Sequence, residues 1–594
     1  MARRLEHFPN LIAMFFARAA ENRAAPFLWR KQAGAWVPTS WADAARQVAS
    51  LAAGLRAIGL NPGDRVMLVA ENRPEWCISD LAIVAAGCIT VPTYTTNTER
   101  DHAHIIETSG ARAVIVSTQK LANALMPAVL KSIHAQHVIG IDPVRLGQSG
   151  VECHDWRTLI ARHPAEPKDV AADFSREDLA CIIYTSGTGG SPRGVMQHHG
   201  AILHNCAGCT AVISEDFGWG DDVLLSFLPL SHAYEHTGGQ FFAIALGAQI
   251  YYAESLDKLA ANIEEVRPTV MFVVPRLFEV LRTRITKAIQ KQGGASAWLL
   301  ARALEIGARQ YEGRLRLIDR PTQLLVNRVF KPKIAKKFGG RMKAMVSGGA
   351  PLNAEVGLFF HSLGLNFLQG YGQTEAAPVI SCNRPAAGIR MDSVGPPLID
   401  TEVRIAEDGE ILVRGELVMH GYWRNEAETA KVLQNGWLHT GDIGEIDDRG
   451  RIRITDRKKD LIINDKGDNV APQKVEGMLT LQPEIVQAMI AGDRRPHMVA
   501  LIVPDPDWTQ EWCAANGTSC KFERLAQNSA YRTALGHAIE RVNKDLSATE
   551  RIRRFMLADA PFGIENEQLT PSLKIRRHVI RQVYGERLDA LYGS

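Results

Sequence analysis

Short apolar runs separated by helical patterns recur along the first 280 residues. Residues 65–70 (RVMLVA) predict a buried strand, residues 71–74 a turn, residues 76–86 a helix and residues 90–92 the start of the next strand. Further apolar runs of the same kind occupy residues 113–116, 179–183, 223–227 and 270–274. This alternation of strands and helices predicts a large α/β assembly.

The pattern changes after residue 400. Residues 407–414 and 447–454 place turn residues between alternating apolar and polar positions, which predicts β-hairpins in a β-rich subdomain that ends before residue 456. Beyond Lys459, strands at 486–490 and 498–503 mix with helices. That stretch is long enough for one small α+β domain.

The fold class that follows is α/β with two domains. We expect a large N-terminal domain of stacked α/β sheets plus the β-rich subdomain over residues 1–456, and a small α+β C-terminal domain over residues 460–594. No apolar run approaches the roughly 20 residues of a membrane span. The nine cysteines are scattered, and the single CxxC at 206–209 has no second pair, which argues against a disulfide framework and against a zinc site. We expect a soluble protein in a reducing, cytoplasmic setting, without a signal peptide.

Charge is distributed unevenly, although the formal net charge is only +3. From Arg282 to Lys343, sixteen Lys or Arg residues face three acidic residues. Such a basic stretch suits an anionic membrane surface or nucleic acid, and it also suits a merely solvated helical face. Because aromatic rings that could stack on bases are few there (among them Trp298, Tyr311 and Phe330), we favour peripheral contact with a membrane and expect no nucleic acid partner.

The stretch IIYTSGTGGSPRGVM, residues 182–196, places glycines and hydroxyls directly after a predicted strand. Backbone N–H groups and hydroxyls of such a loop converge on phosphate oxygens, and glycine permits the close approach. The pattern GxxxxGK[ST] fails because Val195 and Met196 stand where Lys and Ser or Thr are required. A glycine-rich surface turn is the other interpretation of the loop alone.

Several motifs together resemble one family. Residues 184–195 (YTSGTGGSPRGV) are similar to the phosphate-binding signature of the adenylate-forming superfamily, from which they depart at Gly189, in place of a threonine, and at Arg193, in place of a lysine. The other family signatures follow in the expected order: Ser347–Pro351 (SGGAP), Gln369–Glu375 (QGYGQTE), Trp437–Asp442 (WLHTGD), Asp456–Ile463 (DRKKDLII) and Leu569–Lys574 (LTPSLK).

The resemblance implies an AMP-forming acid:thiol ligase. Such enzymes attack the α-phosphate of ATP with a carboxylate, release pyrophosphate and pass the acyl group from acyl-AMP to a thiol; the protein positions the groups and stabilises phosphoryl charge. A helical stretch at about 280–340, which coincides with the basic region, is similar to that of long-chain fatty acyl-CoA synthetases. The implied small molecules are ATP, Mg²⁺, CoA and a long-chain fatty acid.

The same resemblance assigns residues to the phosphate end of the site. The residues that would cradle pyrophosphate, with Arg193 countering its charge, are Thr185, Ser186, Gly187, Thr188, Gly189 and Gly190. Glu375, with Thr188, would hold Mg²⁺, which prefers oxygen ligands. Thr374 would bind the α-phosphate, and Lys574 would bridge phosphate and carboxylate oxygens as they react.

For the nucleoside and the acid, the resemblance implies a second set. Asp442 would accept hydrogen bonds from both ribose hydroxyls, assisted by Arg457, and Tyr371 would pack on adenine. His232 would lie beside the carboxylate, although a histidine at a strand-to-helix corner is often structural. The other implied nucleotide-binding residues are Gly348, Gly349, Ala350, Pro351, Gly370, Gly372 and Gln373.

Rotation of the C-terminal domain about a hinge at 457–459 is a further implication, with Lys459 as the pivot. After the hinge, Lys466 replaces the first glycine of the family's usual segment, and with Gly467 it would lie on the route of CoA. Lys466 would either hinder thioester formation or hold a phosphate of CoA, and the sequence leaves this open.

Three functions therefore remain. The leading one is a long-chain fatty acid:CoA ligase; the second, motivated by Lys466, is a fatty acyl-AMP ligase that delivers to a carrier protein. The third, motivated by Gly189 and Arg193, is a nucleotide- or acyl-binding protein with little catalysis. The chain length of the acid and the oligomeric state stay open.

Overall fold

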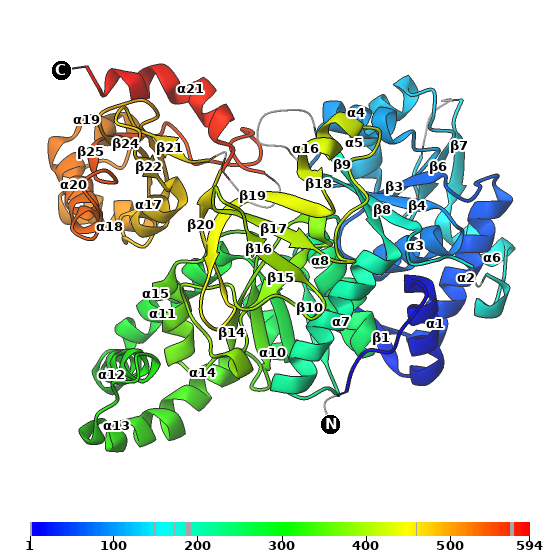
Figure 1. Ribbon diagram of the computed structural model, residues 1–594, viewed down its shortest axis with the longest axis horizontal. Helices are drawn as coiled ribbons and strands as arrows, with labels where there is room; N and C mark the ends of the chain where they lie inside the picture. The colour runs from blue at the N-terminus through cyan, green and yellow to red at the C-terminus, as the bar shows by residue number, and fades with distance from the viewer. Residues whose placement is uncertain are drawn as a thin grey trace.

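Two large, mainly parallel sheets organise the chain up to residue 382 (Figure 1). The computed structural model describes residues 3–145, 150–170, 173–185, 192–458, 460–570 and 575–593, without the side chains of residues 276, 522 and 523. Helices cover the faces of these sheets, and a β-rich subdomain and a smaller C-terminal domain follow. The predicted α/β class is confirmed.

The first sheet contains the two strands that flank the glycine-rich stretch. Its strands lie in the order β7 (Glu152–Asp155), β6 (His137–Gly140), β5 (Ala113–Val116), β3 (Arg65–Val69), β4 (Ile89–Pro92), β8 (Leu179–Thr185) and β9 (Arg193–His198). All neighbours are parallel except β8 and β9, which form an antiparallel pair with Thr185 opposite Arg193. The strands predicted at 65–70, 113–116 and 179–183 are confirmed, and their central residues are buried, as expected where helices cover both faces.

The second sheet carries two of the motifs at its strand ends. Its order is β15 (Val379–Cys382), β14 (Phe367–Gly372), β13 (Ala344–Ser347), β12 (Val270–Val273), β10 (Val223–Ser226), β11 (Gln249–Tyr252), β1 (Pro26–Gln32) and β2 (Ala35–Ser40). The strands predicted at 223–227 and 270–274 are confirmed as β10 and β12. Because β13 and β14 are parallel, their carboxyl ends, which lead into SGGAP and QGYGQTE, lie at one edge of the sheet.

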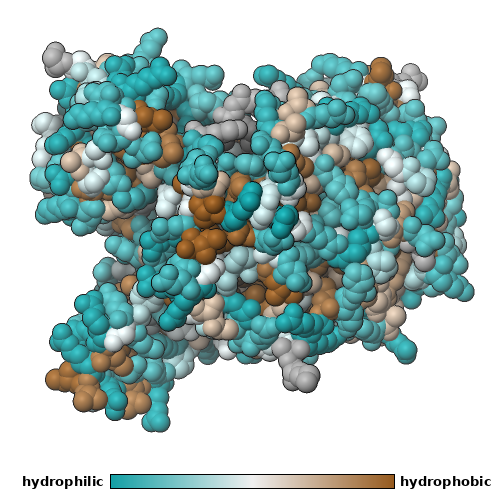
Figure 2. Space-filling model, in the orientation of Figure 1, coloured by the Kyte–Doolittle hydropathy of each residue, from teal (hydrophilic) through white to brown (hydrophobic). Residues whose placement is uncertain are grey.

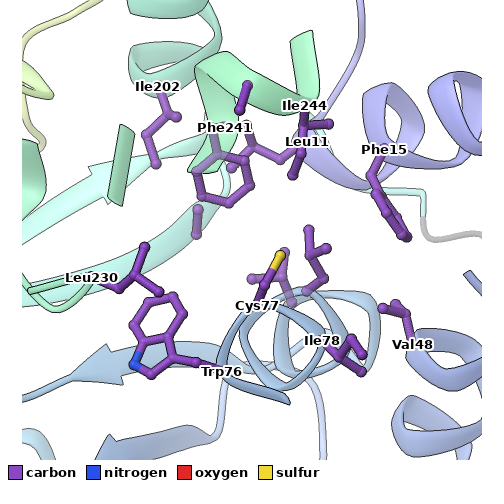
Figure 3. Close-up of a cluster of buried hydrophobic side chains, with 14 of the residues drawn as sticks. Leu11, Phe15, Val48, Trp76, Cys77, Ile78, Ile202, Leu230, Phe241 and Ile244 are labelled. Atoms are coloured by element: carbon purple, nitrogen blue, oxygen red, sulfur yellow. The ribbon is translucent and has the colours of Figure 1, made fainter. Parts of the chain in front are cut away.

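One hydrophobic core joins the two sheets through the helices that lie against them (Figure 3). Up to residue 387, and outside the helical insert of residues 275–337, the helices are α1 (Leu11–Asn22), α2 (Trp41–Ala57), α3 (Pro74–Ala85), α4 (Glu99–Ser109), α5 (Gln119–Lys131), α6 (Trp156–Arg162), α7 (His199–Asp216), α8 (Ala233–Glu235), η2 (His236–Phe241), α9 (Phe242–Leu246), α10 (Leu259–Val266) and α15 (Ala354–Ser362). Short turns are η1 (Pro167–Asp169), η5 (Thr374–Ala376) and η6 (Pro385–Ala387). The helix predicted at 76–86 is α3, and all of its residues are buried. Its Asp80 carboxylate accepts hydrogen bonds from His236 and Gln240 of η2, which makes burial of the charge tolerable.

The helical insert projects from the second sheet as a separate lobe, at the lower left of Figure 1. It consists of α11 (Pro275–Gln292), α12 (Gly294–Tyr311), η3 (Leu317–Asp319), α13 (Arg320–Leu325), η4 (Val326–Phe330) and α14 (Lys331–Lys337), which confirms the predicted helical stretch. Buried side chains such as Phe278, Leu300 and Phe330 pack it against α15 and the sheet. Within the described residues, neither the insert nor another helix is long and apolar enough to cross a membrane.

The β-rich subdomain is a mixed-length antiparallel sheet built on two hairpins. Its elements are β16 (Glu402–Ile405), β17 (Glu410–Arg414), α16 (Glu426–Val432), β18 (Leu433–Gln434), β19 (Trp437–Ile446) and β20 (Ile452–Arg457). The predicted hairpins are confirmed as β16–β17 and β19–β20. Gly409 and Gly450 have φ angles of +83° and +74°, so their turns require the conformation that glycine adopts most easily.

The C-terminal domain places helices on both faces of a small sheet. Its elements are the pair β21 (Ile462–Ile463) and β22 (Asn469–Val470), the sheet β23 (Ile485–Ala491), β24 (Met498–Pro504) and β25 (Ile552–Leu557), and the helices α17 (Pro472–Leu479), α18 (Pro506–Ala515), α19 (Phe522–Gln527), α20 (Ser529–Asn543) and α21 (Arg577–Ala590). Separate hydrophobic clusters lie on the two faces of β24. The strands predicted at 486–490 and 498–503 are confirmed.

Candidate functional site

One cleft collects most of the residues that the motifs predict. It has a volume of about 3750 Å³, and residues of both domains line it. Pockets for one small ligand usually enclose roughly 300–1,000 Å³, so this cleft has room for more than one substrate. The predicted residues on its wall are Thr185, Arg193, His232, Gly348, Gly349, Ala350, Pro351, Gly370, Tyr371, Gly372, Gln373, Thr374, Glu375, Asp442 and Arg457.

Asp442 is the centre of one corner of the cleft. It lies on β19 opposite Arg457 of β20, and Arg457 Nε donates to Asp442 Oδ1 at 3.1 Å. The hydroxyl of Tyr371, at the end of β14, donates to Asp442 Oδ2 at 2.7 Å. Both oxygens of a nearly buried carboxylate are thus fixed by partners from two sheets, which orients its remaining lone pairs toward the cleft.

The phenol of Tyr371 is a permanent donor in this corner. Burial and the neighbouring Asp442 carboxylate raise the pKa of Tyr371 well above its ordinary value, so the hydroxyl keeps its proton at any physiological pH. The sequence predicted that this ring packs on adenine. The structure adds a second task, because the same side chain holds the carboxylate that is predicted to bind ribose.

Glu375 is the centre of the second corner. The hydroxyl of Tyr422 donates to Glu375 Oε1 at 2.8 Å. The guanidinium of Arg193 lies 4.3 Å from the centre of the Tyr422 ring and donates to Glu428 Oε2 at 2.9 Å. Burial and Glu375 raise the pKa of Tyr422 far above its usual value, so this phenol also remains a donor. An arginine and a carboxylate predicted to contact phosphate and metal are therefore linked through one tyrosine.

The backbone around Thr374 and Glu375 is held from outside the motif. Gln197 Nε2 on β9 donates to the carbonyl oxygen of Thr374 at 2.7 Å, and the Met419 N–H donates to that of Glu375 at 2.9 Å. These bonds fix the short turn η5 against the hairpin that carries Arg193. Both Thr374 and Glu375 are thereby presented to the cleft by a rigid backbone.

Two glycines of the motifs have no room for a side chain. A Cβ at Gly372 would lie 1.9 Å from the carbonyl oxygen of Pro378, and a Cβ at Gly348 would lie 2.8 Å from the Tyr234 ring. Both positions therefore require glycine for packing as well as for the approach of a ligand. Gly349 has a φ angle of +81°, which also favours glycine.

Two amide side chains on the cleft wall carry buried atoms with no partner among the described residues. They are Oε1 of Gln369 and Nε2 of Gln373. Buried polar atoms are nearly always hydrogen-bonded in folded proteins. An acceptor and a donor left in this state within QGYGQTE are therefore well suited to a polar ligand, and Gln369 was not among the predicted site residues.

His232 has a structural task and also faces the cleft. It caps α8, where its Nδ1 accepts a hydrogen bond from the Tyr234 N–H at 3.1 Å. Both interpretations offered by the sequence therefore fit the geometry. Nearby, Phe227, Val274 and Leu277 give this end of the cleft an apolar wall.

Several predicted residues lie outside the described part of the chain: Ser186, Gly187, Thr188, Gly189, Gly190, Lys459 and Lys574. Their described neighbours are informative. Thr185 and Arg193 border the glycine-rich stretch, Thr570 and Ile575 border the stretch that ends at Lys574, and all four line the cleft. By contrast, Lys466 and Gly467 are exposed on the turn between β21 and β22 and are not among the described residues that line it.

Sequence reasoning missed Gln197, Tyr422 and Glu428. Each contacts a motif residue that is distant in sequence, and none lies in a stretch with a recognisable pattern. Only the pairing of β9 with β8, and the packing of residues 419–423 beside β9, bring them to the site. A weak signal existed in Tyr422-Trp423, an aromatic pair within a loop of a β-rich region.

Comparison with protein families gives two matches. The family described as AMP-binding enzyme matches residues 15–423, and the family described as AMP-binding enzyme C-terminal domain matches residues 459–594. Of the site residues discussed above, Glu428, Asp442 and Arg457 lie between the two matched segments.

Curated relatives match along nearly the whole chain. The long-chain-fatty-acid–CoA ligase FadD15 of Mycobacterium tuberculosis is 31% identical over 98% of this chain and 97% of its own length. Long chain acyl-CoA synthetase 1 of Arabidopsis thaliana is 29% identical over 99% of this chain and 91% of its own length. The long-chain-fatty-acid–CoA ligase 1 of Homo sapiens is 31% identical over 90% of this chain and 79% of its own length.

Solved structures share the fold at lower identity. The adenylation domain of a carboxylate reductase from Mycobacterium chelonae has a TM-score of 0.77 at 22% identity, and covers 99% of this chain and 92% of its own. The anthranilate CoA ligase AuaEII, solved with anthranoyl-AMP, has a TM-score of 0.74 at 19% identity, and the match covers 98% of this chain and 99% of the ligase. At such identities the likeness concerns the fold.

Proposed function

Because this chain belongs to the AMP-binding enzyme family, we propose that it is a long-chain fatty acid:CoA ligase that activates the acid with ATP. The observation that carries the proposal is the meeting, in one cleft, of Asp442, Thr374 and Glu375 with an apolar wall. The near full-length similarity to long-chain-fatty-acid–CoA ligases supports the choice of acid and of CoA.

In the first half-reaction, a carboxylate oxygen of the acid attacks the α-phosphorus of ATP. The bond from that phosphorus to the bridging oxygen breaks, pyrophosphate leaves, and acyl-AMP remains. Negative charge develops on phosphoryl oxygens, so hydrogen-bond donors and cations that are fixed in advance lower the barrier. Thr374 would donate to the α-phosphate, Arg193 would balance the departing pyrophosphate, and Lys574 would contact the reacting oxygens.

Nucleoside binding would fix the position of the α-phosphorus. Asp442 would accept hydrogen bonds from the ribose hydroxyls, since Arg457 and Tyr371 hold both its oxygens in place. The unpartnered amide atoms of Gln369 and Gln373 would contribute polar contacts to the nucleotide. Orientation of this kind converts an encounter of two substrates into a reaction within one complex.

Mg²⁺ fits the acidic corner by its chemistry, because a hard cation prefers oxygen ligands. Glu375 would hold it, with Thr188 as a second ligand, and the ion would supply charge compensation for the phosphates. Tyr422 orients the Glu375 carboxylate through its hydroxyl. The Arg193 guanidinium lies 4.3 Å from the centre of the same ring, so the protein's own cation would share the phosphate charge.

In the second half-reaction, the sulfur of CoA attacks the acyl carbon, the bond from that carbon to the phosphate oxygen breaks, and AMP leaves with its electron pair. We propose that rotation of the C-terminal domain about Lys459 separates the two steps. Lys466 and Gly467, exposed away from the cleft wall, would reach the acyl group only after such a rotation. The boundaries 1–456 and 460–594 are those of the two bodies that would move.

A substrate panel tests the proposal. Full-length protein, Mg²⁺ and ATP are mixed with short-, medium- and long-chain acids and with benzoate, and AMP and acyl-CoA are measured with and without CoA. We expect catalytic AMP release only with long-chain acids and CoA, and none when α,β-methylene-ATP replaces ATP. Transfer of the acyl group to a carrier protein but not to CoA would favour the second function, and the absence of any acid-dependent AMP would contradict the proposal.

We further propose that the insert contacts anionic membranes. Leu317 and Ile318 are 74% and 81% exposed, and Leu324 is 58% exposed. Figure 2 shows apolar residues gathered at the free tip of the lobe, at the lower left. The exposed residues Arg314, Arg316, Arg320 and Arg328 flank them in the sequence. Exposed apolar side chains among cationic ones suit the boundary between acyl chains and acidic headgroups.

Co-sedimentation with vesicles tests the membrane contact. We expect binding to vesicles that contain phosphatidylglycerol or phosphatidylserine, weaker binding as salt rises, and little binding to pure phosphatidylcholine. Binding to all vesicles regardless of salt, or to none, would refute it. This outcome is independent of the substrate panel, which uses dispersed acids.

A further inference from the structure

Three metal-ligating side chains converge at the outer edge of the first sheet, away from the cleft. His137 begins β6, and Glu152 and His154 lie on the edge strand β7. Because Glu152 is paired with His137 in the parallel register, and residues two apart on a strand share a face, the three side chains point to the same side. Figure 1 places β6 and β7 at the far right of the molecule, opposite the C-terminal domain.

The three potential ligand atoms are spaced like the ligands of one ion. His137 Nδ1 lies 3.2 Å from His154 Nε2 and 3.3 Å from Glu152 Oε2, and His154 Nε2 lies 3.6 Å from the same oxygen. In a tetrahedral zinc site with bonds of about 2.0–2.2 Å, neighbouring ligand atoms are roughly 3.3–3.5 Å apart. The observed spacing therefore needs only small adjustments to accept an ion.

The donor set of the cluster suits a cation. Two imidazole nitrogens and one carboxylate oxygen converge here, and each can offer a lone pair to a metal ion. Arg112 is the charged neighbour that works against a cation, but its guanidinium is already engaged by Asp64 and Gln136.

A comparison with the second cluster of possible ligands shows what distinguishes this one. Glu177, His198 and His420 also approach one another. There, however, His198 uses both ring nitrogens on the backbone: Nδ1 lies 2.9 Å from the Arg176 carbonyl oxygen, and Nε2 lies 3.2 Å from that of Val418. Its ring is therefore committed, whereas the atoms at β6 and β7 contact one another.

We propose that His137, Glu152 and His154 form a binding site for a divalent transition-metal ion of the zinc type, with the fourth position open to water. Imidazole ligands select such ions over Mg²⁺, which prefers an all-oxygen shell. The ion would tie the edge strand β7 to β6 and so stabilise this end of the sheet. The cysteine pattern gave no sign of it, because histidine and glutamate supply the ligands.

Direct binding of Zn²⁺ tests the site. Tag-free, metal-stripped, full-length protein with the exposed cysteines replaced (Cys153→Ser and Cys520→Ser) is titrated calorimetrically with Zn²⁺ in excess Mg²⁺. We expect one ion per chain, and at least a tenfold loss of affinity in Glu152→Gln and in His154→Ala. The control His134→Ala removes a nearby histidine that lies 3.6 Å from Glu107 but contributes nothing to the cluster, and it should bind as the parent does.

Two further measurements separate a built site from surface binding. Co²⁺ should give the visible absorption of a four-coordinate ion in the parent and lose it in Glu152→Gln, whose side chain is 69% exposed and can be changed without harm to folding. Zn²⁺ should raise the Tm of the parent but not of that variant. Equal affinity for Zn²⁺ in the parent and in Glu152→Gln, or a six-coordinate Co²⁺ spectrum, would overturn the proposal.

Discussion

The two corners of the cleft around Asp442 and Glu375 and the helical insert both carry charged side chains, but they hold them in opposite ways. In the cleft, Asp442 and Glu375 are each fixed by a tyrosine hydroxyl, and Asp442 also by an arginine. In the insert, sixteen basic residues face three acidic ones between Arg282 and Lys343, and apolar side chains of η3 and α13 stand in solvent.

The difference reflects the size and order of what each region would bind. A transition state has its charges at fixed points, so groups that stabilise it must be held in advance, and single residues should matter greatly. A lipid surface is large and fluid, so many weak and redundant contacts suffice. Each prediction below changes one member of one region.

The largest effect is expected at Lys574, the residue proposed to contact the reacting oxygens. Lys574→Ala should lower acyl-adenylate formation on the order of 10³-fold, because a cation is lost from the reacting phosphoryl group. Pyrophosphate exchange measures this step, and thioester formation from supplied acyl-adenylate should survive. Lys544→Ala, an exposed lysine of the same domain, is the matched control. Equal loss of both half-reactions would remove Lys574 from its assigned role.

Asp442→Asn should have the next largest effect. It keeps the shape of the side chain but loses an acceptor and leaves Arg457 without its counter-charge, so kcat/KM for ATP should fall about 100-fold. Asp448→Asn, at an exposed turn of the same hairpin, should be unchanged. If both variants keep the parent's kcat/KM, Asp442 does not bind the nucleotide.

In the insert, the double variant Leu317→Ser with Ile318→Ser should weaken binding to anionic vesicles at least tenfold, because each buried methylene contributes roughly 0.8 kcal/mol and two of them already exceed the roughly 1.4 kcal/mol of a tenfold change. Turnover of dispersed fatty acid should not change. Ile133→Ser, which removes an apolar residue that is 83% exposed elsewhere on the surface, is the control. Equal loss of vesicle binding in the control would mean that the tip has no special role.

Tyr422→Phe should have a smaller effect in the cleft. It removes the hydrogen bond to Glu375 but keeps the ring beside Arg193. The Mg²⁺ concentration for half-maximal rate should therefore rise about fivefold, which corresponds to roughly 1 kcal/mol, the usual net contribution of one hydrogen bond. A lower maximal rate with no change in Mg²⁺ dependence would instead indicate that Tyr422 acts through Arg193.

Glu235→Gln should have the smallest effect on activity, and its effect on stability should appear only in the dependence on pH. Burial raises the pKa of Glu235 to about 8, whereas a glutamate in an unfolded chain has a pKa of about 4.3. The folded protein therefore holds an extra proton between these two pH values. The free energy of unfolding should therefore fall as pH rises through that window. Glu235→Gln should flatten the dependence of Tm on pH, and the exposed Glu511→Gln should not. A parallel pH profile in Glu235→Gln would contradict the assignment.

Much of the fold could be predicted because burial on both faces leaves a clear pattern. Four or more consecutive apolar residues mark strands such as β5 and β12, and Gly409 marks a hairpin turn. The exposure of Leu317 and Ile318 at the tip of the insert could not be predicted, because adjacent apolar residues usually indicate a buried position. Their exposure depends on how the whole lobe projects from the sheet.

The candidate site was predictable where its residues form contiguous motifs at strand ends. Asp442 and Tyr371, which lie 71 residues apart, came from two separate motifs, but their hydrogen bond is visible only in the folded chain. Tyr422 and Glu428 were not found, since they lie in a loop and in helix α16 and contact Glu375 and Arg193 only in the folded chain. Sequence motifs identify the groups that touch a ligand more readily than the groups that orient them.

The most direct test of the account follows the phosphorus atoms of ATP by ³¹P NMR during turnover with a long-chain fatty acid, CoA and Mg²⁺. Cleavage between the α- and β-phosphates should produce AMP and pyrophosphate, each equal in amount to the acyl-CoA formed. Formation of ADP and orthophosphate, or consumption of ATP that does not depend on the acid, would contradict the central claim.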